Sequence, residues 1–369
     1  MPIGLYLHVP FCVSKCPYCD FYSLVATNDA LDAYTAALCT AIHRWGERVH
    51  DTADTVYLGG GTPSLLGPER LSRVLNAVHR AFAVPDTAEI TLEANPADDL
   101  QAVLSAFVAA GGNRLSLGMQ AVRDDHLHTL GRRHSVAQAE HAIATAHAVG
   151  ITNVSLDLML GTPQQTAADV RAGADRCAAW GASHVSAYLL KLEPNTPFGS
   201  APPPLPDEDV TAELYLTAAE ALESHGYRHY EISNFALPGR ESRHNTKYWN
   251  LDPYLGIGPS AHSFYGGTRF AYPRDLAAFL NGCDPTPENP DHVGVAENSP
   301  EEYALLRLRL AEGLREDAFT ARFGTALPAA WRERAAALPP TLVVCDEHGI
   351  RLTRDGFLVS NAVLAHLLS

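Results

Sequence analysis

The sequence contains no long hydrophobic run and no excess of positive charge. No apolar stretch approaches the ~20 residues of a membrane-spanning helix, and the first residues lack the charged start and apolar centre of a secretory signal. The formal net charge is −15, which disfavours surfaces that bind nucleic acid or anionic membranes. We therefore expect a cytoplasmic protein with no integral membrane segment and no nucleic-acid partner.

Cysteine is scarce and irregularly spaced. The chain has seven cysteines, an odd number without a regular pairing pattern, which fits a reducing compartment. Three of them, Cys12, Cys16 and Cys19, fall within eight residues and follow the spacing C-x3-C-x2-C. Downstream no second Cys/His pair stands out, although structural zinc sites usually draw their ligands from two such pairs.

This cysteine loop allows three interpretations. Positions 12, 16 and 19 would share one buried stripe of a helix, but Pro10 and Pro17 disfavour a helix there. A zinc site would need His8 or Asp20 as its fourth ligand. An iron–sulfur cluster is the third interpretation, and a [4Fe-4S] cluster held by only three thiolates would leave one iron open to an outside ligand. The spacing favours the cluster and leaves the zinc site as an alternative.

Apolar runs that predict strands alternate with helical periodicity six times. The predicted strands begin at about residue 5 and continue at 55–58, 89–92, 114–118, 153–160 and 184–190. Such alternation predicts a parallel sheet covered by helices, and we expect an α/β fold with an incomplete (β/α)6 barrel of the TIM type rather than a doubly wound sheet. We divide the chain into a barrel over 1–237, a connecting segment over 238–298 and a small C-terminal domain over 299–369.

Polar residues collect where the predicted strands end. Gly59-Gly60-Gly61-Thr62-Pro63 follows the second strand, and the later strands end at Glu93, Gln120, Asp157 and Glu193. The glycines expose backbone N–H groups to a polar ligand. Ordinary turn chemistry explains the glycines well and the carboxylates poorly. In a barrel these strand ends meet at one mouth, so we expect a site there.

The cysteine loop, the glycine motif, Glu93-Ala94-Asn95-Pro96 and Gly256–Ser263 together resemble the radical S-adenosylmethionine superfamily. They resemble most the branch that contains oxygen-independent coproporphyrinogen III oxidases and HemW-type haem chaperones. The resemblance implies a [4Fe-4S] cluster on Cys12, Cys16 and Cys19, with S-adenosylmethionine on its open iron. It also implies cofactor contacts at Tyr6, Tyr18, Gly60, Gly61, Thr62 and Glu93, and at Gln120, Arg132 and Asp157, which in the oxidase line a second S-adenosylmethionine site. From the residues alone, the alternative for Glu93 is a helix-capping or turn carboxylate, and the alternative for Arg132 is a solvated arginine beside Arg133.

Two departures separate the oxidase pattern from the chaperone pattern. The oxidase has a further cysteine two residues after the third cluster ligand, where this chain has Phe21. The oxidase also begins with an additional N-terminal segment. His244-Asn245-Thr246-Lys247-Tyr248-Trp249 matches the H-N-x-x-Y-W motif associated with haem binding in the chaperone group, so His244 is a candidate haem contact. The structural alternative is that His244 and Asn245 satisfy backbone groups at a bend.

The C-terminal domain resembles the small winged-helix-type domain of the same family. It contains eight arginines and nine Asp and Glu residues, so it lacks the excess of positive charge that a DNA-binding surface needs. The resemblance, with Phe21 and the H-N-x-x-Y-W motif, implies a haem chaperone that binds haem and transfers it to haem-accepting proteins, and a homodimer is possible. The alternative is an oxygen-independent coproporphyrinogen III dehydrogenase, so whether the protein is an enzyme stays open. The third hypothesis is a zinc-stabilised structural protein.

Overall fold

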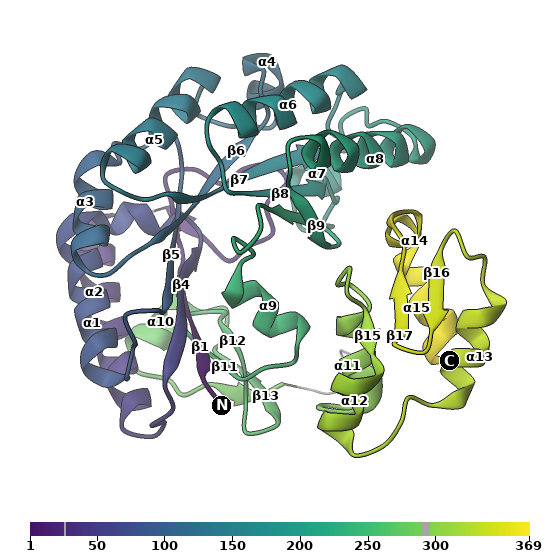
Figure 1. Cartoon of the computed structure of the whole chain (residues 1–369). Helices are drawn as coiled ribbons and strands as arrows, with labels where there is room; N and C mark the ends of the chain where they lie inside the picture. The colour runs from purple at the N-terminus through teal and green to yellow at the C-terminus, as the bar shows by residue number, and fades with distance from the viewer. Residues whose placement is uncertain (26, 289–295) are drawn as a thin grey trace.

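Six strand–helix units form most of the molecule in the computed structural model, which describes residues 1–25, 27–288 and 296–369 (Figure 1). Their strands are β1 (Ile3–Val9), β4 (Ala53–Gly60), β5 (Glu89–Ala94), β6 (Arg114–Gln120), β7 (Asn153–Leu160) and β8 (His184–Leu189). The helices that follow them on the outside are α1 (Asn28–Gly46), α2 (Gly67–Ala81), α3 (Gln101–Ala109), α5 (Val136–Ala148), α6 (Ala167–Ala179) and α8 (Glu208–Ser224). The predicted incomplete barrel is confirmed. In the described part of the chain, no helix combines the length and apolar character needed to cross a membrane.

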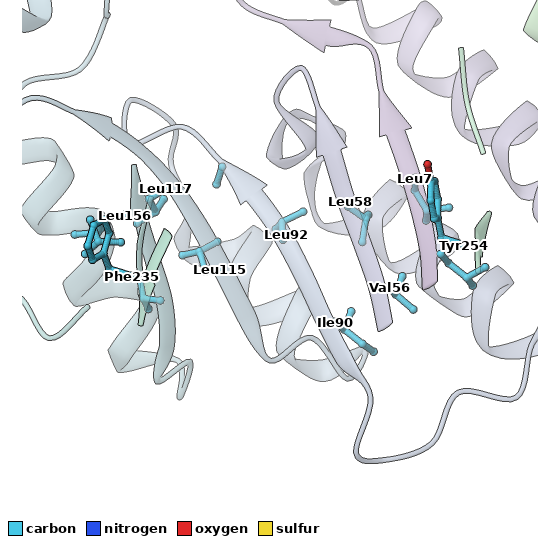
Figure 2. Packing of buried hydrophobic residues seen from close by; sticks show 14 of the residues in the cluster. Leu7, Val56, Leu58, Ile90, Leu92, Leu115, Leu117, Leu156, Phe235 and Tyr254 are labelled. Atoms are coloured by element: carbon cyan, nitrogen blue, oxygen red, sulfur yellow. The ribbon is translucent and has the colours of Figure 1, made fainter. Parts of the chain in front are cut away.

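The two faces of the parallel sheet differ in chemistry. On the outer face, apolar side chains of successive strands form one buried cluster with the helices, as Leu7, Leu58, Leu92 and Leu117 illustrate (Figure 2). The alternate positions face the inside of the barrel and are mostly polar. On β4 to β8 they include Thr55, Tyr57, Glu93, Arg114, Ser116, Ser155, Asp157, His184, Ser186 and Tyr188. Because successive strand residues point to opposite faces, one alternating pattern specifies both a hydrophobic core and a polar interior.

The segment predicted as a connection over 238–298 contributes to the main sheet. After α9 (Arg243–Trp249), strand β11 (Tyr254–Ile257) pairs in parallel with β1, and β12 (His262–Tyr265), β13 (Thr268–Ala271) and β14 (Thr286–Pro287) extend the sheet antiparallel. At the other edge, β10 (Asn234–Ala236) and β9 (Arg228–Glu231) follow β8. The division of the chain at residues 237 and 298 stays a prediction. These strands are too short for their alternation to distinguish them from loops in sequence. Residues 289–295 of the predicted connecting segment lie outside the described residues.

Helix α9 lies inside the curve of the sheet rather than among the outer helices (Figure 1). The carboxylate of Glu89 on β5 accepts hydrogen bonds from the backbone N–H groups of Arg243 (3.1 Å) and His244 (2.9 Å), at the N-terminus of the helix. The side chain of His244 then enters the barrel beside Thr55 and Tyr57. A short helix thus fills the polar interior, and its N-terminal N–H groups are satisfied by a buried carboxylate.

The C-terminal domain packs against the open side of the barrel (Figure 1). Its elements are α11 (Pro300–Arg307), β15 (Leu314–Arg315), α12 (Glu316–Phe323), α13 (Ala329–Ala337), β16 (Val343–Asp346), β17 (Gly349–Leu352), α14 (Arg354–Leu358) and α15 (Ser360–Leu368). Backbone hydrogen bonds from Ile232 to Arg309 and from Ala311 to Tyr230, each 3.0 Å, join it to β9. The small antiparallel sheet and its helices match the predicted α+β, winged-helix-like form.

Replacing Glu89 by alanine tests how much α9 depends on this carboxylate. The Glu89→Ala variant leaves the buried N–H of His244 and the partly buried N–H of Arg243 without their acceptor, and a buried N–H left unpaired costs about 1–3 kcal/mol. We expect the free energy of unfolding in urea to fall by about 2–4 kcal/mol. Glu140→Ala on the exposed face of α5 is the matched control. Equal stability of the two variants would show that Glu89 does not anchor α9.

Candidate cofactor site

A cavity of about 170 Å³ lies at the mouth of the barrel, where the parallel strands end. Eleven of the thirteen residues that the sequence predicts as site residues line it. They are Cys12, Cys16, Cys19, Tyr18, Gly60, Gly61, Thr62, Glu93, Gln120, Arg132 and Asp157. The other two, Tyr6 and His244, lie below it inside the barrel. The rule that chemistry collects at the carboxyl ends of barrel strands therefore located the cavity correctly.

Two side chains on β1 hold the cysteine loop against the barrel. The Nε2 atom of His8 lies 3.0 Å from the backbone carbonyl of Tyr22, and the hydroxyl of Tyr6 lies 3.0 Å from Nδ1. Because a carbonyl only accepts, Nε2 carries the ring proton, and the hydroxyl of Tyr6 donates to Nδ1. Burial lowers the pKa of His8, which keeps the ring neutral as this arrangement requires. Tyr6 thus supports the loop through His8 rather than facing the cavity.

The glycine motif packs directly on the strand that carries the first cysteine. Backbone N–H groups of Gly61 and Thr62 donate to the carbonyls of Val9 (2.9 Å) and Phe11 (2.7 Å). A Cβ atom on Gly61 would lie 2.5 Å from the carbonyl oxygen of Phe11. Gly60 has a φ of 110°, a conformation that other residues rarely adopt. The glycines are therefore needed to bring two strand ends together as well as to line the cavity.

Two polar side chains approach the sulfur atoms from other loops of the barrel mouth. The Thr62 hydroxyl lies 3.6 Å from Sγ of Cys12, and Nη1 of Arg132 lies 3.5 Å from Sγ of Cys16. The second guanidinium nitrogen of Arg132 donates to the carbonyl of Gly118 (2.8 Å), which fixes its direction. A partly buried cation and a hydroxyl donor next to these thiols would stabilise the negative charge of thiolates.

These residues fit a cluster better than a single metal ion. Cys12, Cys16 and Cys19 all line one cavity, which is the arrangement that a cluster held by three thiolates requires. In the described ranges, no three His, Cys, Asp or Glu side chains stand close enough to share one ion. The zinc interpretation requires such a group, whereas a cluster spreads its ligands over several iron atoms.

Acidic groups form the floor of the cavity. Glu93 accepts hydrogen bonds from the Tyr57 hydroxyl (2.8 Å) and from the backbone N–H of Gly60 (3.1 Å). Burial raises the pKa of Glu93, and these two hydrogen bonds act in the opposite direction. Burial, reinforced by the charge of Glu93, raises the pKa of Asp157 to about 7. Asp157 in this low-dielectric site is therefore partly protonated near neutral pH.

The far wall of the cavity includes a strained residue and a residue that the sequence did not indicate. Gln120 has a φ of 69°, which is uncommon for a residue other than glycine, next to an irregularity in the pairing of β6 with β7. Its side-chain oxygen accepts a hydrogen bond of 2.7 Å from the hydroxyl of Tyr188. Tyr188 lies two positions after Ser186, which is paired with Asp157. The period-two rule applied to β8 would have placed Tyr188 in the site.

His244 is the predicted site residue that lies deepest in the protein. Its Nδ1 atom lies 2.8 Å from Oγ1 of Thr55, and its Nε2 atom lies 2.8 Å from the hydroxyl of Tyr248. The side chain is 1% exposed, and burial, with the charges of Lys247 and Arg114, lowers its pKa to about 3. His244 is thus a neutral ring that links α9 to the sheet.

A larger hollow of about 970 Å³ lies elsewhere, between the end of α9 and the C-terminal domain. None of the predicted site residues lines it. Its Arg307 and Arg315 already form ion pairs with Glu312 and Asp317, and Arg322 donates to the carbonyl of Leu251. Volume alone would select this hollow, but the reactive side chains lie in the smaller cavity.

Replacing Asp157 by asparagine tests the raised pKa. Because the pKa of about 7 in the folded protein exceeds the ordinary 3.8, the folded protein binds this proton more tightly than the unfolded chain. The free energy of unfolding therefore falls as the pH rises from about 4 to about 7. We expect the Asp157→Asn variant without cluster to gain stability over the parent protein at pH 8, with a smaller gain at pH 5, in urea unfolding. The control is Asp86→Asn at an exposed position, and a gain independent of pH would contradict the raised pKa.

Comparison with known proteins agrees with this geometry. The model of the radical SAM superfamily matches residues 6–177, and that of the HemN C-terminal domain matches residues 296–359. A heme chaperone HemW from Mycobacterium tuberculosis is 38% identical over 380 residues, covering 100% of this chain and 95% of that protein. HemW from Escherichia coli is 35% identical over 337 residues, covering 88% of this chain and 86% of that protein.

Among solved structures, coproporphyrinogen III oxidase (HemN) from Escherichia coli matches with a TM-score of 0.82 at 22% identity, covering 100% of this chain and 90% of that one. At this identity the likeness shows the fold alone. The full-length similarity to the HemW proteins is high enough to show the family. The chain therefore belongs to the HemW family within the radical S-adenosylmethionine superfamily.

Proposed function

We propose that this protein is a haem chaperone, which binds haem and transfers it to haem-accepting proteins. The observation that carries the proposal is the full-length similarity to proteins named heme chaperone HemW. Phe21 supports it, because this position carries a cysteine in the oxidase pattern and an exposed phenylalanine here. Cytoplasmic location and a homodimer belong to the same proposal.

The proposal assigns a [4Fe-4S] cluster to Cys12, Cys16 and Cys19, and superfamily membership implies S-adenosylmethionine as the second cofactor. When bound, such a cluster supplies an iron atom that no protein thiolate occupies. Side chains of the protein would surround the cluster and donate hydrogen bonds to its sulfur ligands. Thr62 and Arg132 donate towards the sulfur atoms, which stabilises the thiolate form.

The remaining lining residues would orient S-adenosylmethionine. Gly60, Gly61 and Thr62 border the cavity on one side, although their backbone N–H groups are already bonded to Glu93, Val9 and Phe11. Tyr18 provides an aromatic wall beside Arg132. Glu93 is already oriented by two hydrogen bonds, so it offers a fixed carboxyl group for a ligand amino group. Tyr6 acts on the site indirectly, by orienting His8 under the cysteine loop.

The second candidate function is oxygen-independent coproporphyrinogen III dehydrogenase. The observation that favours it is that Gln120, Arg132 and Asp157 lie in the same cavity as the three cysteines. In the oxidase, the corresponding residues line a second S-adenosylmethionine site. The residues that line the cavity are compatible with both functions. The chaperone and the dehydrogenase must therefore be distinguished by measuring coproporphyrinogen III turnover and haem binding on one preparation.

That test uses protein reconstituted anaerobically with iron and sulfide. We expect about four iron atoms per chain, binding of ferric haem that is followed by its Soret band, and haem release to an apo-haemoprotein. With coproporphyrinogen III, S-adenosylmethionine and a reductant, we expect no protoporphyrinogen above the level of a cluster-free control. Cys16→Ser should lose the cluster, whereas Cys39→Ser, whose sulfur lies on α1 away from the cavity, should keep it.

Three results would contradict these assignments. Formation of protoporphyrinogen at an enzymatic rate would overturn the chaperone proposal in favour of the dehydrogenase. Bound zinc with no cluster spectrum would overturn both. Cluster loss in Cys39→Ser as well as in Cys16→Ser would remove the assignment of the cysteine loop.

The haem contact expected of His244 stays a prediction, and it requires a rearrangement. Haem ligation by Nε2 would displace Tyr248, and access would require α9 to leave the barrel interior. His244→Ala tests it in the same Soret titration. If His244 ligates the iron, the variant should lose the wild-type spectrum and most of its affinity, while the iron content of the cluster stays constant. Unchanged haem affinity and spectrum would remove His244 as a ligand.

A further inference from the structure

Exposed apolar side chains are concentrated around the cysteine loop. Among the described residues nine large apolar side chains are exposed, and four of them lie between positions 13 and 25. These four are Val13 (45% exposed), Phe21 (66%), Leu24 (40%) and Val25 (70%), and we call them the apolar lip. Four such side chains so close in sequence are not explained by packing, because none of them is buried in the core.

The lip adjoins the cofactor cavity directly. Phe21 lines the cavity although two thirds of the residue is exposed, so it borders both the cavity and the outer surface. Leu24 and Val25 form β3 (Leu24–Val25), which pairs in parallel with β2 (Phe11–Cys12), so that Val25 lies opposite Cys12. The lip is thereby fixed to the same backbone that carries the first cysteine.

Two cations flank the lip. Lys15 is exposed and lines the cavity mouth together with Phe21. Arg274 is also exposed, donates to the backbone carbonyl of Asp20 (3.0 Å) and lies 5.9 Å from the ring centre of Tyr22. Neither forms an ion pair with a carboxylate in the part of the chain that the structure describes. In a chain with a net charge of −15, two uncompensated cations beside an apolar surface favour an amphipathic anionic ligand.

We propose that the apolar lip is the haem-binding surface, an inference that rests on the proposed chaperone function. The flat macrocycle would lie on Phe21, Leu24 and Val25, and the two propionates would face Lys15 and Arg274. Haem matches both features, since it combines a large apolar face with two carboxylates. The surface is already accessible, so haem binding here requires no displacement of α9.

The extent of the lip favours a small ligand over a protein partner. A stable protein–protein interface buries about 800 Å² on each partner, and four partly exposed side chains provide only a fraction of that area. A planar tetrapyrrole needs a contact surface of only a few side chains. A second copy of this chain and an acceptor protein are therefore treated as outcomes of the test.

The test is a binding titration of reconstituted protein with three probes: ferric haem, metal-free protoporphyrin IX and the dimethyl ester of haem. For Phe21→Ser/Val25→Ser we expect the Kd for haem and for protoporphyrin IX to rise about tenfold or more, because apolar contact area is lost. For Lys15→Gln we expect a rise of about threefold or more for haem and no change for the dimethyl ester, which lacks the charges that Lys15 would pair with. Val359→Ser and Arg171→Gln, at exposed positions elsewhere, are the matched controls and should bind like the parent protein.

A second variant, Leu24→Ser/Val25→Ser, leaves Phe21 unchanged, so it remains informative if serine at position 21, two residues after Cys19, disturbs the cluster. Unchanged haem affinity in both double variants would overturn the proposal. So would a change in oligomeric state with haem affinity intact, which would make the lip an interface between copies. If the parent protein binds no haem at all, the chaperone function itself fails, and that result is distinct from unchanged binding in the variants.

Discussion

The structure depends on the alternation of apolar and polar side chains along the parallel strands. Apolar residues at one set of positions pack against the outer helices, and the alternate set turns polar groups into the barrel. The polar groups inside the barrel must form hydrogen bonds with one another, because each buried polar group without a partner is destabilising. Some of these hydrogen bonds join helix α9 to the sheet: Glu89 accepts from the N-terminus of the helix, and the ring of His244 bonds to Thr55. The mouth above them is left for ligands.

Two hydrogen bonds connect the interior of the barrel to the cysteine loop at its mouth. Tyr6 and His8 lie on one strand, and through them a buried hydroxyl fixes the return of the cysteine loop at Tyr22. Gly61 allows the second strand end to approach the same loop. The position of the sulfur atoms is therefore set by the first two strands, whereas Arg132 arrives from a later part of the barrel. Mutations below the mouth should thus influence the site without touching a ligand.

Much of this was predictable from the sequence, because the signals are local. The cysteine spacing, the glycine run and the carboxylates at strand ends indicated eleven residues of one cavity before their distances were known. The predictions failed where long-range packing decides. Nothing in the sequence around His244 indicates that α9 enters the barrel, and β11 to β14 are too short to show strand periodicity. Tyr188 was missed although period-two alternation would have found it. The exposure of Phe21 depends on the fold of the loop, so its sequence signal was only the departure from the oxidase pattern.

The central claim is that one loop holds a cluster on its inner side and receives haem on its outer side. Iron anomalous diffraction from crystals of the reconstituted, haem-loaded protein tests this most directly, since it locates every iron atom independently of sequence assignments. The account predicts one iron–sulfur site in contact with Cys12, Cys16 and Cys19, and a separate haem iron whose macrocycle lies on Phe21, Leu24 and Val25. A haem iron bonded to His244 inside the barrel, or in the hollow next to the C-terminal domain, would contradict it.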